Sequence, residues 1–249
     1  YSAICGITEK ELRSELKTDI EIITQANEET YEEACAHLKL QYDGYHFSKR
    51  CEDIYNPFSL FNAFVGKHYE NFWFSTGTPT FLIELLKQSQ FDIRELDNTT
   101  ATAEQFDAPT NVITDPIPVL YQSAYLTIKG YDPDFELYTL AYPNKEVRKG
   151  FIESLMPAYV HLPARENTFY VMSFIKDLRV GNIGSCLERM RSFFASIPNQ
   201  NNKEEKHYQT IFYLLFRLMG QNVDVEVNTA IGRADAVVKM QNAILCFRI

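Results

Sequence analysis

The sequence predicts an α+β fold, in which a mostly helical N-terminal part precedes further helices and a small sheet. Three observations support this prediction. Apolar residues recur at three- and four-residue steps through most of the first 90 residues. A helix–hairpin–helix pattern follows over residues 116–156. Near the C-terminus, a helical stretch precedes three short segments that have the apolar pattern of β-strands.

The N-terminal helices are predicted from their start signals. Thr8 and Glu11 form a capping box, in which each side chain satisfies a free backbone N–H of the first turn. Proline directly after Asn56 or Thr78 is typical of a first helical position. Helices are therefore expected over residues 8–24 and 30–40, from Pro57, and from Thr78-Pro79. The polar segments 41–56 and 92–114 are expected to be loops, the second with a short helix.

The middle of the chain predicts a winged-helix-like unit. Residues 116–126 read as a helix, and the segments LTIKG and FELYTLA read as two strands around the turn Asp132-Pro133-Asp134. Asn144 then caps a helix. Helix, hairpin and helix follow one another in winged-helix units, which often bind DNA and also serve as packing modules. We place a domain boundary within residues 157–167, so the expected domains are 1–160 and 161–249.

The C-terminal domain is expected to hold two connecting helices and then a compact α/β core. The two helices cover 168–180 and 182–197, and a polar linker follows. A helix over 204–219 ends at Gly220, a natural helix stop. The three expected strands are VDVEV, ADAVVK and AILCF, at residues 223–227, 234–239 and 243–247.

Charge and composition exclude several classes of protein. The net charge of −9 argues against a protein that coats nucleic acid. Residues 1–160 hold 13 basic and 25 acidic side chains, whereas residues 161–249 hold 11 basic and 8 acidic ones, so contact with DNA or RNA is expected in the second part. No apolar run is long enough for a membrane span, and the five cysteines are scattered, which predicts reduced thiols and a cytoplasmic location.

Asp235 is the acidic residue most in need of an explanation. It lies near the start of an otherwise apolar strand, where a buried carboxylate without a partner or a metal is costly. The pattern alone is also explained if Asp235 caps a turn, pairs with Arg233 or points to solvent.

A family resemblance adds to this reading. The segment GRADAVV, with EEKHYQTIFYLLFRLMG before it and AILCF after it, resembles the start of a PD-(D/E)XK nuclease domain. The whole chain resembles a bacterial family in which an AAA-ATPase-like domain precedes such a nuclease domain. The phrases that carry this resemblance are YDGYHF (42–47), YNPFS (55–59), FWFSTGTPTFLIELL (72–86), LYQSAYLTIKGYD (120–132) and LYTLAYPNKEV (137–147).

The resemblance implies a magnesium site. In this superfamily a strand Asp and a following Glu-x-Lys bind a divalent metal, usually Mg²⁺, and activate the attacking water. Asp235 matches the strand Asp and is the implied metal ligand. Glu205, or Glu204, is the candidate acid from the preceding helix, and Gln209 lies one turn further on the same face. These residues form the predicted catalytic set.

Two departures make this catalytic machinery incomplete. Arg248 stands where the family has the Glu, and a cation cannot ligate Mg²⁺. The sequence also has no GxxxxGK[ST] motif, so ATP is expected only with an upstream P-loop domain. The sequence begins without Met, and the Lys position would follow Ile249, so we expect a piece of a longer protein.

Two hypotheses about function follow. In the first, the chain is a fragment of an AAA-ATPase-like protein with a nuclease-like domain that acts on nucleic acid in the intact protein. In the second, a degenerate nuclease fold serves as a non-catalytic interaction or regulatory module. The resemblance does not decide whether the chain is an enzyme, and the oligomeric state stays open.

Overall fold

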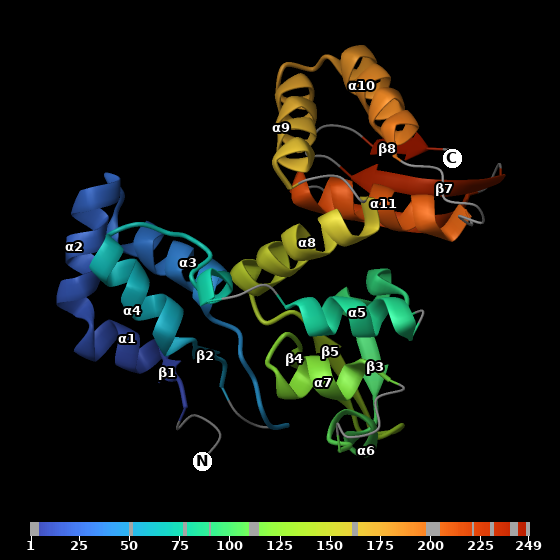
Figure 1. Ribbon diagram of the computed structural model, residues 1–249. Coiled ribbons are helices and arrows are strands. Elements are labelled where there is room, and N and C mark those ends of the chain that lie inside the picture. Colours follow the sequence, from blue (N-terminus) through green and yellow to red (C-terminus); the bar gives the residue numbers. More distant parts are fainter. Residues whose placement is uncertain are drawn as a thin grey trace. The chain divides into compact units, whose positions relative to one another are not determined.

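The computed structural model describes residues 5–49, 52–76, 79–89, 91–109, 115–160, 164–197, 205–220, 222–229, 232–239 and 244–247. Helices and small antiparallel sheets alternate along the chain (Figure 1). The chain divides into two compact units, Tyr1–Phe151 and Ile152–Ile249. The predicted α+β class is confirmed.

The first unit begins with a helical layer. Its helices are α1 (Glu9–Glu15), α2 (Lys17–Asn27), α3 (Tyr31–Tyr42) and α4 (Pro57–Gly66). Two short strands, β1 (Ile7–Thr8) and β2 (Ile54–Tyr55), pair antiparallel and bring the start of α1 to the start of α4. Buried apolar side chains from all four helices form one core, including Leu12, Ile20, Leu38 and Leu60.

The helix starts agree with the capping signals. Thr8 and Thr30 each form a complete capping box, with Glu11 and Glu33 respectively, and Asn56 caps α4. The single helix expected over 8–24 is wrong, because the chain breaks at Leu16, with φ −108° and ψ 20°, and continues as α2. Leu16 ends α1 and begins α2, so the apolar spacing runs through the break.

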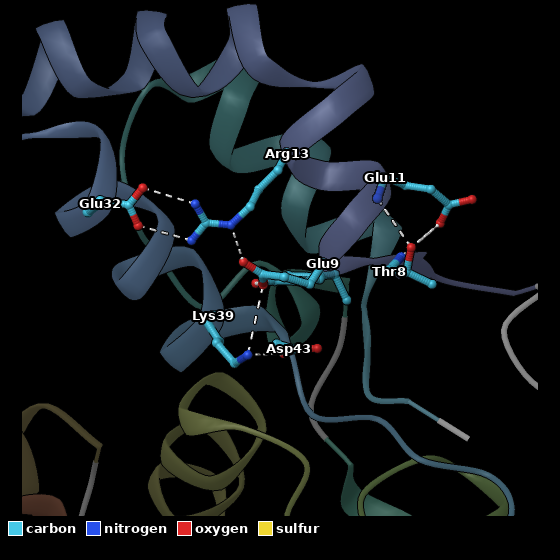
Figure 2. Close-up of polar contacts among 8 residues, drawn as sticks. Thr8, Glu9, Glu11, Arg13, Glu32, Lys39 and Asp43 are labelled. Carbon is cyan, nitrogen blue, oxygen red and sulfur yellow. Dashed lines mark hydrogen bonds and ion pairs between the residues drawn. The ribbon is translucent and has the colours of Figure 1, made fainter. Parts of the chain in front are cut away.

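A polar network covers the outer surface of these helices. The Arg13 guanidinium donates to Glu9 Oε1 at 2.6 Å and to both carboxylate oxygens of Glu32 at 3.0 and 3.1 Å. Lys39 Nζ lies 3.9 Å from Glu9 and 3.8 Å from Asp43 (Figure 2). The network therefore connects α1 to both ends of α3.

The rest of the first unit is built around a three-stranded sheet. Its elements are η1 (Trp73–Thr76), α5 (Thr80–Gln88), η2 (Ile93–Asp97), β3 (Thr99–Ala101), α6 (Ala103–Phe106), α7 (Ile117–Gln122), β4 (Thr127–Asp132), β5 (Leu137–Ala141) and the start of α8 (Lys145–Val160), which continues into the second unit from Ile152. The strand order is β3-β5-β4, with antiparallel neighbours. The helix–hairpin–helix order is confirmed, and Asn144 Oδ1 accepts the Val147 N–H at 3.0 Å.

Three details of this region differ from expectation. Part of the segment expected as a loop forms β3, the edge strand that pairs with β5. Pro79 stands at the N-cap of α5, so the helix starts at Thr80, and Thr78 lies outside the described residues. Pro157 lies inside α8, which continues to Val160.

The second unit holds a helical hairpin and a small sheet. Helices α9 (Ala164–Arg179) and α10 (Ile183–Ser196) pack against each other around Phe174 and Phe193, both fully buried. Helix α11 (Glu205–Leu218) packs against β6 (Asn222–Thr229) and β7 (Gly232–Lys239), and β8 (Ile244–Phe247) completes the sheet. The predicted helix followed by three sequential strands is confirmed.

Within the described ranges, no helix has both the length and the apolar character that a membrane crossing demands. Among the cysteines that the structure describes, Cys5, Cys35 and Cys186 are free thiols.

Candidate functional site

Asp235 lies on the middle strand of the C-terminal sheet. The strand order is β6-β7-β8, and both pairings of β7 are antiparallel. Its neighbours Ala234 and Ala236 pair with Val227 and Val225 of β6, which places Asp235 at the register level of Glu226. The side chain of Asp235 lies outside the described residues. Strand β7 is paired with β6 on both sides of this position, and with β8 from Ala236 onward.

Helix α11 supplies the other two predicted site residues. Glu205 is its first residue, and Gln209 follows one turn later on the same face. Gln209 is buried, with 2% of its surface exposed, although it is a polar residue that usually reaches solvent. Thr210 beside it is also buried. The side chain of Glu205 lies outside the described residues.

Most of α11 is buried. Residues 209–216 are buried without interruption, which is typical of a helix covered on several sides rather than of a surface helix. Leu214 and Leu215 have no exposed surface. The helix ends before Gly220, whose φ of +75° is the left-handed conformation that stops a helix. Because α11 packs against β6 and β7, the helix forms a layer on the sheet.

The donor set does not fit a complete magnesium site. Mg²⁺ requires several hard oxygen ligands in near-octahedral geometry. Asp235 supplies one carboxylate and Glu205 a second, whereas Gln209 supplies only an amide. Arg248, in the position expected for a further carboxylate, lies outside the described residues. Among the described side chains, no three or more His, Cys, Asp or Glu residues gather as metal ligands would.

Aromatic side chains that the sequence reasoning did not single out surround the start of α11. The rings of His207 and Tyr159 stack with centroids 6.3 Å apart, and Tyr208 meets His207 edge-on. The ring centroids of Phe194 in α10 and Phe212 in α11 lie 6.4 Å apart. A helical periodicity search could have found these contacts only with knowledge of which helices pack together.

A second buried polar centre lies in the first unit, and the sequence analysis missed it. Glu146 is fully buried, and its Oε1 accepts the Trp73 backbone N–H at 2.9 Å. Burial raises the pKa of Glu146. Tyr45 stacks on the Trp73 ring, with centroids 5.7 Å apart. Tyr45 is itself buried, so the aromatic phrase YDGYHF packs into the core at this point.

The segment YDGYHF (42–47) is hydrogen-bonded to the hairpin through the side chain of Lys129. Lys129 of β4 donates from Nζ to the Gly44 carbonyl at 2.5 Å and to the Pro143 carbonyl at 3.1 Å. Burial lowers the pKa of Lys129. Thr127 Oγ1 also bonds to both backbone groups of His46. Because its ammonium group already donates hydrogen bonds to two backbone carbonyls, Lys129 has a structural role.

The hairpin turn has the wrong charge for a DNA-contacting wing. Asp132, Asp134 and Glu136 cluster around its tip, and each would repel phosphate. Phe135 projects there with 73% of its surface exposed. Lys49 Nζ lies 3.7 Å from the ring centroid of Tyr131, one residue before the turn. The helix–hairpin–helix unit is therefore better explained as a packing module.

Comparisons with known proteins agree with the C-terminal reading. Residues 203–247 match the model of the PD-(D/E)XK nuclease superfamily. The segment that carries α11 and the three-stranded sheet is thus a PD-(D/E)XK nuclease-like domain segment.

One relative covers the chain more widely. A protein of Azotobacter chroococcum mcd 1, named "Uncharacterized protein in vnfD 5'region", is 30% identical over 259 residues. That alignment takes in 99% of this chain and 47% of the relative, so the chain spans about half the length of the protein it matches. No solved structure matches the chain.

Proposed function

We propose that the C-terminal domain binds nucleic acid with a nuclease-like core whose metal site is incomplete. The observation that carries this proposal is the placement of Asp235 on the central strand, next to a helix that begins with Glu205 and buries Gln209. The superfamily match over residues 203–247 supports the same assignment. The domain boundaries proposed for the chain remain 1–160 and 161–249.

Arg248 accounts for the loss of catalysis in this proposal. Phe247 pairs with Ala236, the neighbour of Asp235, and Arg248 follows in the sequence where the family that the chain resembles has its Glu. A guanidinium there repels a divalent cation and attracts a phosphate group. The same position that removes metal chemistry thus favours a nucleic-acid backbone, and cleavage by this chain is not expected.

In the intact protein, we propose that the first unit is the C-terminal part of an AAA-ATPase-like domain. Nucleotide turnover would then act on a nucleic acid held by the nuclease-like domain in the cytoplasm. This step rests on the sequence resemblance, because the chain has no P-loop motif. Hydrolysis of ATP by the full-length protein, stimulated by DNA or RNA, is the measurement that tests it.

Metal binding tests the site assignment. Calorimetry with Mn²⁺ and Mg²⁺ on the chain, on Arg248→Glu and on Arg248→Glu with Asp235→Ala separates the contributions of the two residues. We expect weak or no binding by the chain, binding by Arg248→Glu, and loss of that binding in the double variant. Arg248→Glu with Asp224→Ala is the matched control, because it removes an acid from the neighbouring strand.

A different result would reject the assignment. If Arg248→Glu with Asp235→Ala binds metal as well as Arg248→Glu does, Asp235 is not the ligand. If Arg248→Glu folds and gains no binding, the site is not a lost nuclease site. The second candidate function, a non-catalytic interaction module, would then be favoured, and Arg248 is the observation that already points to it.

A further inference from the structure

Helix α9 presents an unusual surface. Its outward face carries a stripe of residues at alternating four- and three-residue steps, and we call it the α9 stripe. The residues of the stripe at these steps are Arg165, Phe169, Met172, Lys176 and Arg179, and the stripe also includes Val180, which directly follows the helix. Every one of them is exposed. Phe169 and Met172 leave 67% and 61% of their surfaces accessible. Large apolar side chains gathered this way on a surface usually mark an interaction site.

The stripe has a positive charge that is not neutralised within it. Among the described residues, no ion pair involves Arg165, Lys176 or Arg179. Of the two acids of α9, Glu166 is about 100° around the helix from Arg165 and lines the pocket beside Phe169, whereas Asp177 is buried. Asp177 pairs instead with Arg189 of α10 at 2.8 Å. The chain as a whole has a net charge of −9, so this positive face is local.

Two open pockets flank the Phe169 ring. The larger, about 480 Å³, is lined by Arg165, Glu166, Phe169 and Tyr170. The smaller, about 290 Å³, lies between α9 and α10 and adds Ser173, Glu188, Arg189 and Ser192. The larger volume falls within the range of ligand pockets and the smaller lies just below it. Both pockets are open to solvent and include Phe169 in their lining.

From these observations we infer that the α9 stripe binds a single strand of nucleic acid. A base stacks on Phe169, with Met172 beside it, and the three cations contact phosphates along the strand. Arg165 and Arg179 are 14 residues apart, so the stripe is about 21 Å long and covers several nucleotides. Alternation of cations with an exposed aromatic ring is the pattern of single-strand binding surfaces.

An acidic amphipathic helix is the main competitor for this surface. A helix partner needs a continuous row of apolar anchors, and Lys176 interrupts the apolar residues of the stripe. A second copy of the chain would bring identical cations together, which is unfavourable. The arrangement of charge thus favours a polyanion with flat apolar groups. The inference rests on the proposed nucleic-acid function and gives it a surface outside the Asp235 region.

Binding is measured by fluorescence anisotropy with a labelled oligothymidine of about 20 nucleotides and with a duplex of the same length. Three variants are compared with the chain: Arg165→Gln/Lys176→Gln/Arg179→Gln, Phe169→Ala and Phe169→Tyr. The matched control, Lys10→Gln/Lys17→Gln/Lys67→Gln, removes three exposed cations from the first unit. Because all substituted side chains are exposed, circular dichroism and melting should show each variant folded.

We expect the single strand to bind more tightly than the duplex. The stripe triple variant should weaken binding about tenfold or more and lower the salt slope by about 2, since each phosphate contact on a single strand contributes about 0.7. Phe169→Ala should weaken binding about tenfold, as loss of one stacked base does, and Phe169→Tyr should retain it. The control triple variant should bind like the unsubstituted chain.

Three results would overturn the inference. Equal binding by the stripe variants and the chain would place the nucleic-acid surface elsewhere and leave the proposed function standing. Displacement of the oligothymidine by polyglutamate at equal charge concentration would assign the stripe to an acidic polypeptide. No binding of any nucleic acid would remove both the stripe and the nucleic-acid part of the proposed function, whereas the metal-binding test of Arg248→Glu would still report separately on Asp235.

Discussion

The fully buried carboxylate of Glu146 accepts the backbone N–H of Trp73 at 2.9 Å, across 73 residues of sequence. This bond fixes η1 against the start of α8 within the first unit. Glu146→Leu should lower the free energy of unfolding by about 1–3 kcal/mol, because the Trp73 N–H loses its acceptor in a buried place. Glu146→Gln keeps an oxygen and should cost less. Urea unfolding followed by circular dichroism measures both, and equal losses in the two variants would contradict the prediction.

The buried carboxyl of Glu146 should also affect how the stability of the protein depends on pH. Its pKa is raised from the usual 4.5 by burial, so the folded protein binds a proton that the unfolded chain has released. Stability contributed by protonated Glu146 is therefore present below pH 4.5 and is lost as pH rises through the raised pKa. The loss proceeds at no more than about 1.4 kcal/mol per pH unit.

Glu11 and Glu33 affect the pH dependence of stability in the opposite direction to Glu146. Backbone N–H groups of Thr8 and Thr30 hold the pKa of these carboxyls below 4.5, so their contribution exists above that pH and is lost on acidification. Unfolding measured from pH 3 to pH 8 in the chain and in Glu146→Gln isolates the buried group. The difference between the two proteins should change only above about pH 4.5. A difference that is constant across the range would show that Glu146 does not titrate with a raised pKa.

The capping boxes should make measurable contributions to stability. Thr8→Ala and Thr30→Ala each remove the side-chain oxygen that accepts the N–H of the third helical residue, at 3.2 and 3.3 Å. Loss of such a cap costs about 1 kcal/mol. Thr18→Ala is the control, since Thr18 is exposed within α2 and caps no helix. Thermal melting should show two destabilised variants and one that is close to unchanged.

Gly44 should tolerate no side chain. Its φ is +98°, and a Cβ there would lie 2.2 Å from the Pro143 carbonyl oxygen, which is backbone and also holds Lys129. Gly44→Ala should therefore destabilise the chain by clearly more than the roughly 1–2 kcal/mol of the left-handed conformation alone. Gly181→Ala, at φ +72° with nothing within 4 Å, is the matched comparison. Equal unfolding midpoints for the two variants would refute the role given to the Gly44–Pro143 contact.

Local signals in the sequence were enough to place most helices. The capping box at Thr8 and the proline after Asn56 are decided within four residues, so the sequence contains them in full. The break at Leu16 and the strand β3 were not predicted. β3 exists because Thr99–Ala101 pairs with β5, some 40 residues away, and a three-residue strand has no periodicity of its own.

The candidate site was predicted only in part. Strict alternation in VDVEV and the apolar run around Asp235 placed the strands, and the structure adds that β7 is the central one. Burial of Gln209 and the contacts around His207 depend on which elements pack together, which a single sequence does not encode locally. The roles of Asp235, Glu205 and Gln209 as site residues stay predictions. The α9 stripe is visible at helical spacing, but its meaning depends on the exposure of Phe169 and Met172.

Trp73 is the single tryptophan of the chain, and it stacks on Tyr45 inside the first unit. Its fluorescence therefore reports the unfolding of residues 1–151 and is silent about residues 152–249. Circular dichroism reports helices from both units. A chain in which the two signals change at the same urea concentration unfolds as one cooperative system. Separate midpoints would show, without any labelling, that residues 152–249 have an independent stability.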